Sequence, residues 1–82
     1  MVTGNQLRIA RFALRWSVQR LSDETGVPLR TVKRIEAEDS IPSTSASTVH
    51  TLQAALESAG IEFIGTPGDG PGIRIRTSPP KP

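Results

Sequence analysis

One stretch, residues 21–36 with the sequence LSDETGVPLRTVKRIE, constrains the fold of this chain more than any other. It holds two short helical patterns separated by Gly26, which can adopt the left-handed conformation that closes a helix. Pro28 then fits the first turn of the next helix, where its missing N–H is not needed. The sequence therefore predicts helices over 18–25 and 28–36 in a helix-turn-helix arrangement, with a shared buried side formed by Leu21, Val27, Val32 and Ile35.

Helical spacing of apolar residues predicts one further helix before this pair and one after it. The first begins in a capping box, in which Thr3 and Gln6 can each satisfy an amide of the other. The second begins near residues 45–47 and ends before Gly60, a residue typical of helix ends. Apolar positions on these two helices would complete the core: Leu7, Ala10, Leu14, Val49, Leu52, Ala55 and Leu56.

After Gly60 the apolar residues alternate with polar ones, a pattern typical of strands. Segments 61–64 and 73–76 are predicted to form a β-hairpin around a glycine-rich loop at 65–72. An isolated two-stranded hairpin is only marginally stable in water, so its apolar face needs a partner. That partner is either the helical domain or the same hairpin of a second chain, and in the second case the dimer interface would consist of Ile61, Phe63, Ile73 and Ile75.

The 82 residues leave room for one hydrophobic core. We expect a mainly α protein, with a helix-turn-helix domain over 1–60, a hairpin that serves as dimerisation element over 61–76, and a disordered tail over 77–82. No stretch approaches the roughly 18 apolar residues that a membrane span needs, and the N-terminal stretch lacks the apolar core of a secretory signal. These features predict a cytoplasmic protein with no membrane partner.

Composition argues against an enzyme. The chain has no cysteine and one histidine, which disfavours a disulfide framework or a metal cluster. No paired carboxylates stand beside a candidate nucleophile, so acid–base or nucleophilic chemistry lacks its groups. We therefore expect no catalytic residue, no cofactor and no metal.

Charge is distributed unevenly along the chain. Residues 1–35 carry seven basic and two acidic side chains, residues 36–70 carry six acidic and no basic ones, and the last twelve residues add three basic ones. The net charge of +2 hides this separation. A chain with one basic part and one acidic part can orient the basic part toward a polyanion, which favours double-stranded DNA as the partner.

The outward side of the predicted helix 28–36 suits contact with bases in the major groove. An arginine fork can donate two hydrogen bonds to guanine, and an apolar side chain can pack on a thymine methyl group. We assign base contacts to Leu29, Arg30, Lys33 and Arg34. Hydroxyl and basic groups near the helix starts are better suited to phosphate oxygens, which fix the position of a protein on the duplex. We assign these phosphate contacts to Ser17, Arg20 and Thr31.

Over residues 6–60 the chain resembles the Xre/Cro-like, phage-repressor-type helix-turn-helix DNA-binding family. The matching features are Leu21, the Gly26-Val27 turn, the helix RTVKRIE at 30–36 and the stretch AALESAG at 54–60. The following segments, GIEFI at 60–64 and GPGIRIR at 70–76, also resemble the tail of small members of that family. The resemblance implies a four- to five-helix repressor-like domain and a transcriptional regulator, a repressor for example, that binds a two-fold symmetric operator as a homodimer. It also implies a structural ion pair between Arg11 and Glu36.

Two positions depart from the family pattern. Val18 stands where such proteins usually have a glutamine that clamps phosphate, and Pro28 stands where they often have Ser or Thr. We expect weaker phosphate anchoring in the monomer as a result.

The alternative function is a protein-interaction module of the same fold, an anti-activator or antitoxin-like protein that binds a second regulatory protein and binds DNA weakly or not at all. In the hairpin, Arg74 and Arg76 are either a second DNA contact or ionic partners of Glu62, and the sequence favours the latter slightly.

Overall fold

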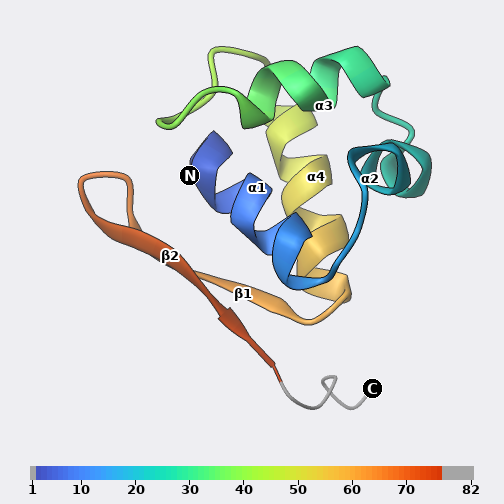
Figure 1. Ribbon diagram of the computed structural model, residues 1–82. Coiled ribbons are helices and arrows are strands. Elements are labelled where there is room, and N and C mark those ends of the chain that lie inside the picture. The colour runs from blue at the N-terminus through green and yellow to red at the C-terminus, as the bar shows by residue number, and fades with distance from the viewer. Residues whose placement is uncertain (1, 77–82) are drawn as a thin grey trace.

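Four helices and one antiparallel hairpin follow one another along residues 2–76, the part of the chain that the computed structural model describes (Figure 1). About half of the chain is helical, so the expected mainly α domain with a C-terminal hairpin is confirmed at this level. The tail expected over 77–82 lies outside the described residues. The elements are α1 (Gly4–Ala13), α2 (Val18–Thr25), α3 (Leu29–Glu36), α4 (Ala46–Ser58), β1 (Ile61–Thr66) and β2 (Asp69–Ile75).

The helix boundaries follow from local capping. At the start of α1 the capping box is present, with Gln6 N donating to Thr3 Oγ1 at 3.0 Å and Thr3 N donating to Gln6 Oε1 at 2.9 Å. Gly26 ends α2 in the left-handed conformation with φ 76°. The prediction that Pro28 lies in the first turn of the next helix was wrong by one residue. Its ψ of 140° is extended, so Pro28 is the N-cap and α3 begins at Leu29.

All four helices and β1 contribute residues to the core. Figure 1 shows α1 and α4 together at the centre of the molecule, with α2, α3 and the hairpin around them. The buried hydrophobic residues are Val2, Leu7, Ala10, Leu21, Val27, Val32, Ile35, Val49, Leu52, Leu56 and Ile61.

No helix in the described part of the chain is long and apolar enough to cross a membrane.

The start of α1 approaches the end of α3 more closely than a side chain would allow. Gly4 N donates to Ser40 O at 3.0 Å, just beyond α3. A Cβ atom added to Gly4 would overlap the carbonyl oxygens of Ile35 and Glu38. Glycine at this position therefore permits the contact between the two helices.

The hairpin is longer than predicted. β1 and β2 pair from Ile61↔Ile75 to Thr66↔Asp69, so most of the expected loop at 65–72 belongs to the strands. The register shifts between Ile64 and Thr66, where Gly65 has φ 78°, and Gly70 has φ 64°. Glycine can adopt these positive φ values without strain, so the ladder continues through a bulge to a short turn.

One side of the hairpin packs against the helices of its own chain. Three of the four residues expected at a dimer interface face this core: Ile61 is 1% exposed, and Phe63 and Ile73 are partly buried against it. Ile75, at the end of β2, is 56% exposed. Of the two predicted partners, the helical domain of the same chain therefore covers most of this apolar face. A strand with alternating residues beside a helical core buries the most apolar surface when its apolar side faces that core.

The side-chain amide of Gln6 joins α1 to both strands. Its Nε2 donates to Ile64 O at 3.0 Å and to Gly72 O at 2.8 Å, while its Oε1 accepts from Thr3 N. Gln6 is 3% exposed. One buried amide thus caps the helix and docks the hairpin.

We predict that Gln6→Glu destabilises the protein by at least about 2 kcal/mol. Glutamate keeps the capping-box chemistry at the start of α1 but replaces two N–H donors with a carboxylate oxygen that faces the carbonyls of Ile64 and Gly72. Urea unfolding followed by circular dichroism measures the change. The matched control is Gln53→Glu on the surface of α4, where the amide contacts only Glu57. An equal effect of the two substitutions would contradict the docking role of Gln6.

Candidate nucleic-acid interface

Hydrogen bonds fix the turn between α2 and α3. Gly26 N donates to Ser22 O at 2.8 Å, and Val27 N donates to Thr25 Oγ1 at 3.2 Å. Ser22 Oγ, on a residue only 9% exposed, donates to Val27 O at 2.6 Å. No sequence pattern predicts this role for Ser22, which has the character of an ordinary polar residue of a helix. The two helices are therefore held in one relative orientation.

α3 has one buried side and one exposed side. Val32 and Ile35 have no exposed surface and belong to the core. Among the residues assigned to base contact, Arg30, Lys33 and Arg34 are exposed and Leu29 is partly buried. The structure thus brings these four residues together on the outer surface of one helix of eight residues.

A buried ion pair attaches the end of α3 to α1. Arg11 Nη2 lies 2.9 Å from Glu36 Oε1, and Arg11 Nε donates to Glu36 Oε2 at 2.9 Å. The two side chains are 12% and 7% exposed. Arg11 Nη1 also donates to Trp16 O at 2.9 Å. The pair that the family resemblance implied is therefore present, with nearly all of its hydrogen-bonding groups engaged.

Arg8 gives α3 a second attachment to α1. Its Nη1 donates to the main-chain oxygen of Glu36 at 2.7 Å, and its Nη2 lies 3.3 Å from Asp39 Oδ1. A cation at the C-terminal end of a helix also interacts favourably with the helix dipole. The sequence did not predict this contact, because spacing within α1 cannot show that a residue 28 positions later lies beside Arg8.

Most basic side chains among the described residues have a carboxylate partner in the protein. Arg8, Arg11, Arg20, Arg74 and Arg76 each lie beside an acidic residue. Of the described Lys and Arg residues, those without such a partner are Arg15, Arg30, Lys33 and Arg34, and three of these four belong to α3.

The position of Arg30 is electrostatically unfavourable for the isolated protein. Lys33 and Arg34 lie in the last turn of α3, where cations stabilise a helix, but Arg30 lies in the first turn, where they do not. That turn contains no acidic residue, and the N-cap Pro28 offers no side-chain acceptor to the first amides. An anion bound at the start of α3 would neutralise the charge of Arg30 and would accept hydrogen bonds from the uncapped amides.

The residues assigned to phosphate contact already make local contacts. Ser17 Oγ accepts from Arg20 N at 3.0 Å as the N-cap of α2. Arg20 stacks 4.5 Å from the centre of the Trp16 ring and lies 3.4 Å from Glu24 on the exposed surface. Thr31 is partly buried on α3. Ser17 and Arg20 thus lie together at the start of α2, and Thr31 lies on the neighbouring helix.

The two arginines at the end of the hairpin share one carboxylate as their ionic partner. Arg74 and Arg76 lie 3.3 Å and 3.6 Å from the carboxylate of Glu62. The slightly favoured prediction, ionic partners for Glu62, is confirmed. Figure 1 places the hairpin on a different side of the helical body from α3, so the hairpin does not extend the basic surface of that helix.

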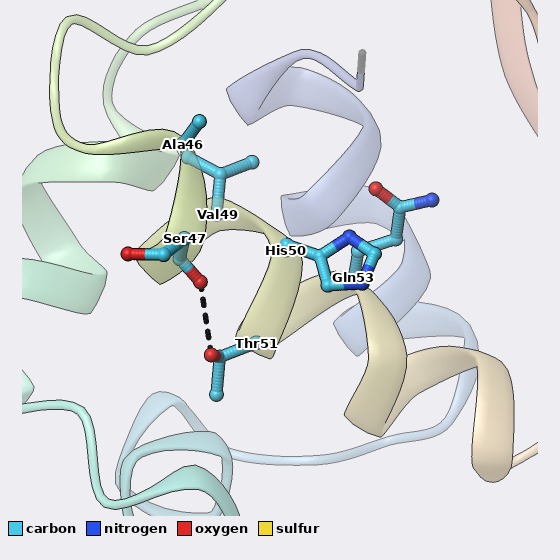
Figure 2. Close-up of a pocket in the computed structure, with 6 residues that line it drawn as sticks. All are labelled: Ala46, Ser47, Val49, His50, Thr51 and Gln53. Atoms are coloured by element: carbon cyan, nitrogen blue, oxygen red, sulfur yellow. Dashed lines mark hydrogen bonds between the residues drawn. The ribbon is translucent and has the colours of Figure 1, made fainter.

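An open hollow of about 520 Å³ lies along α4 (Figure 2). Thr51 Oγ1 donates to Ser47 O within the helix at 2.9 Å, and His50 is exposed. No second element contributes a charged side chain to this hollow, so we assign it no binding role. The residues that line the hollow all belong to α4: Ala46, Ser47, Val49, His50, Thr51 and Gln53.

Within residues 2–76 there is no group of three side chains that could hold a metal ion.

Compared with known proteins, the sequence matches no family model and no curated protein. The candidate interface is therefore defined by its own chemistry, which is the exposed basic side of α3, the turn that fixes α3 against α2, and the arginines of α1 that hold its end.

We predict that Glu36→Leu destabilises the protein by about 3–5 kcal/mol, because it leaves the buried guanidinium of Arg11 without its carboxylate. The double variant Arg11→Met/Glu36→Leu should recover most of this loss, since an apolar pair leaves no unpaired buried charge. Urea unfolding measures both. Glu24→Gln, which removes an exposed partner of Arg20, is the control and should cost less than about 1 kcal/mol. A similar cost for Glu36→Leu and Glu24→Gln would show that the buried pair does not hold α3.

Proposed function

We propose that this protein is a sequence-specific DNA-binding transcriptional regulator of the Xre/Cro-like type. In this proposal α2 and α3 form a helix-turn-helix, α3 enters the major groove, and two copies bind a two-fold symmetric operator. The observation that carries the proposal is the set of exposed cations on α3 that have no carboxylate partner, with Arg30 in the first turn of the helix. A bound polyanion would explain why α3 carries three exposed basic side chains without carboxylate partners.

The spacing of these residues supports base contact. Arg30 and Arg34 are separated by four positions, about one helical turn and about 6 Å along the axis. Base pairs are stacked about 3.4 Å apart, so the two guanidinium groups would reach different pairs. Lys33 and Leu29 lie beside them, and Leu29 would pack on a thymine methyl group. We assign the reading of sequence to these four side chains.

Phosphate contacts would come from the starts of the helices. The first amides of α3 have no side-chain cap, and Thr31 lies next to them. Ser17 and Arg20 would contact the neighbouring phosphate from the start of α2. Val18 packs against the core and offers no phosphate clamp, which is consistent with a weak monomer that gains affinity from a second copy. In a cell such a protein would associate with the nucleoid.

We predict that selection from a pool of random duplexes yields a two-fold symmetric consensus. Against the selected duplex, Arg30→Ala and Arg34→Ala should each lose about 1–3 kcal/mol, or roughly 5- to 150-fold in affinity, and each should relax the preference at its own base position. Fluorescence anisotropy of labelled duplex measures the affinity. The matched control is Arg15→Ala, which removes an exposed and unpaired arginine outside α3.

Salt dependence separates this function from that of a protein-interaction module. Displacement of counterions from phosphates makes DNA binding fall steeply with salt, whereas a largely apolar protein interface does not respond in this way. If no duplex is enriched, or if Arg30→Ala and Arg34→Ala bind as well as Arg15→Ala, the proposed role of α3 is wrong.

A further inference from the structure

One exposed arginine is held against an aromatic ring at the start of α2. The central carbon of the Arg20 guanidinium lies 4.5 Å from the centre of the Trp16 ring. Trp16 belongs to the connection between α1 and α2, and its side chain is partly buried against the core. We call this contact the Trp16–Arg20 stack.

The main chain of Trp16 is fixed by Arg11 at both of its polar groups. Trp16 N donates to Arg11 O at 3.0 Å, and Trp16 O accepts from Arg11 Nη1 at 2.9 Å. The preceding residue, Arg15, has φ 59° and donates to Phe12 O, so the chain leaves α1 in a Schellman motif. Because Arg11 also binds Glu36, the backbone that carries the Trp16 ring is attached to the buried ion pair that holds α3.

The Trp16–Arg20 stack leaves one edge of the guanidinium open. Trp16 lies against its flat face, and Arg20 Nε donates to Glu24 Oε2 at 3.4 Å. Neither Nη atom of Arg20 has a hydrogen-bond partner among the described residues, and the side chain is 55% exposed. Paired donors of an arginine can bind two phosphate oxygens at once. Arg20 therefore presents an oriented and unoccupied donor edge to solvent.

A second contact between an arginine and an aromatic ring differs in this respect. Arg11 lies 4.7 Å from the centre of the Phe12 ring, but all three nitrogens of its guanidinium donate to Glu36 or to Trp16 O. Its side chain is largely buried. Arg11 therefore has a structural role, whereas Arg20 keeps donors free for a ligand.

Stability does not account for the position of Arg20. It lies in the first turn of α2, which contains no acidic residue and where the helix dipole disfavours a cation. An exposed cation–π contact and an exposed ion pair within one helix stabilise a protein only slightly. Their main effect here is orientation, because they restrict a long side chain that otherwise samples many rotamers.

We propose that Trp16 is a positioning residue that orients Arg20 toward a phosphate group of DNA. This inference rests on the proposed function, which assigns a phosphate contact to Arg20, and it adds the residue that orders this contact in advance. A side chain that is ordered before binding loses less conformational freedom when it binds. The ring of Trp16 therefore strengthens DNA binding without contacting DNA.

Affinity for the selected duplex tests the role of the ring. Trp16→Leu should weaken binding about 3- to 10-fold, because Arg20 must then be ordered during binding. Trp16→Phe keeps an aromatic face and should bind more tightly than Trp16→Leu. The matched control is Phe12→Leu, which removes the ring beside an arginine that has no free donor, and it should bind as the parent protein does. Circular dichroism checks that each variant folds.

A double variant separates positioning from a general loss of structure. If Trp16 acts through Arg20, Trp16→Leu should cause no further loss of affinity in an Arg20→Ala background. Independent effects that multiply would overturn the proposal, and so would equal affinities of the parent protein and Trp16→Leu.

The Trp16–Arg20 stack can also be measured without DNA, because Trp16 is the single tryptophan of the chain. Arg20→Ala uncovers one face of the ring, so acrylamide should quench its fluorescence more strongly than in the parent protein. Arg15→Ala removes the neighbouring arginine, which is not part of the stack, and should leave quenching unchanged. Unchanged quenching in Arg20→Ala would overturn the proposal even if Trp16→Leu does not fold.

Failure of this inference is distinguishable from failure of the proposed function. If the parent protein binds no duplex, both fail together. If the parent binds a duplex and Arg30→Ala weakens binding, whereas Trp16→Leu and Arg20→Ala do not, the role of α3 stands and only this inference fails.

Discussion

The ion pair between Arg11 and Glu36 is the interaction on which the rest of the structure depends. It is nearly buried, and it connects the last turn of α1 to the last residue of α3. The same guanidinium group also holds Trp16 O in the connection to α2, so one side chain links three elements. Arg8 binds the carbonyl of Glu36, and Gly4 allows α1 to approach the carbonyls beyond it. α3 therefore has its end fixed while its outer side remains free.

This arrangement divides the basic residues into two groups. Among the described residues, one group is paired with carboxylates, and the other group, which consists of Arg15 and the three basic residues of α3, is exposed without such partners. An arginine in the first turn of a helix, with no acidic neighbour, lowers the stability of that helix slightly. Local choices that oppose stability are expected where a protein binds something. The contrast between these residues, and not the net charge of +2, is what supports our proposal of a polyanionic partner.

Gln6 plays a comparable part for the hairpin. Without its two bonds to Ile64 and Gly72, β1 and β2 would be a two-stranded sheet held only by apolar packing at one end. With them, the sheet is aligned along α1, and β2 contacts that helix. The hairpin therefore completes the core of its own chain and still leaves an edge open.

The sequence by itself determined the local features of this protein. Glycine at 26, the capping box of Thr3 and Gln6, and apolar spacing placed four helices and a hairpin within a few residues of their observed bounds, because these signals act between near neighbours. They also identified the outward residues of α3. Only the tertiary structure decided which face of the hairpin is buried, what Arg8 and the amide of Gln6 bind, and why residue 4 is glycine. The partners of Gln6 lie 58 and 66 residues away, and no periodicity encodes contacts of that separation.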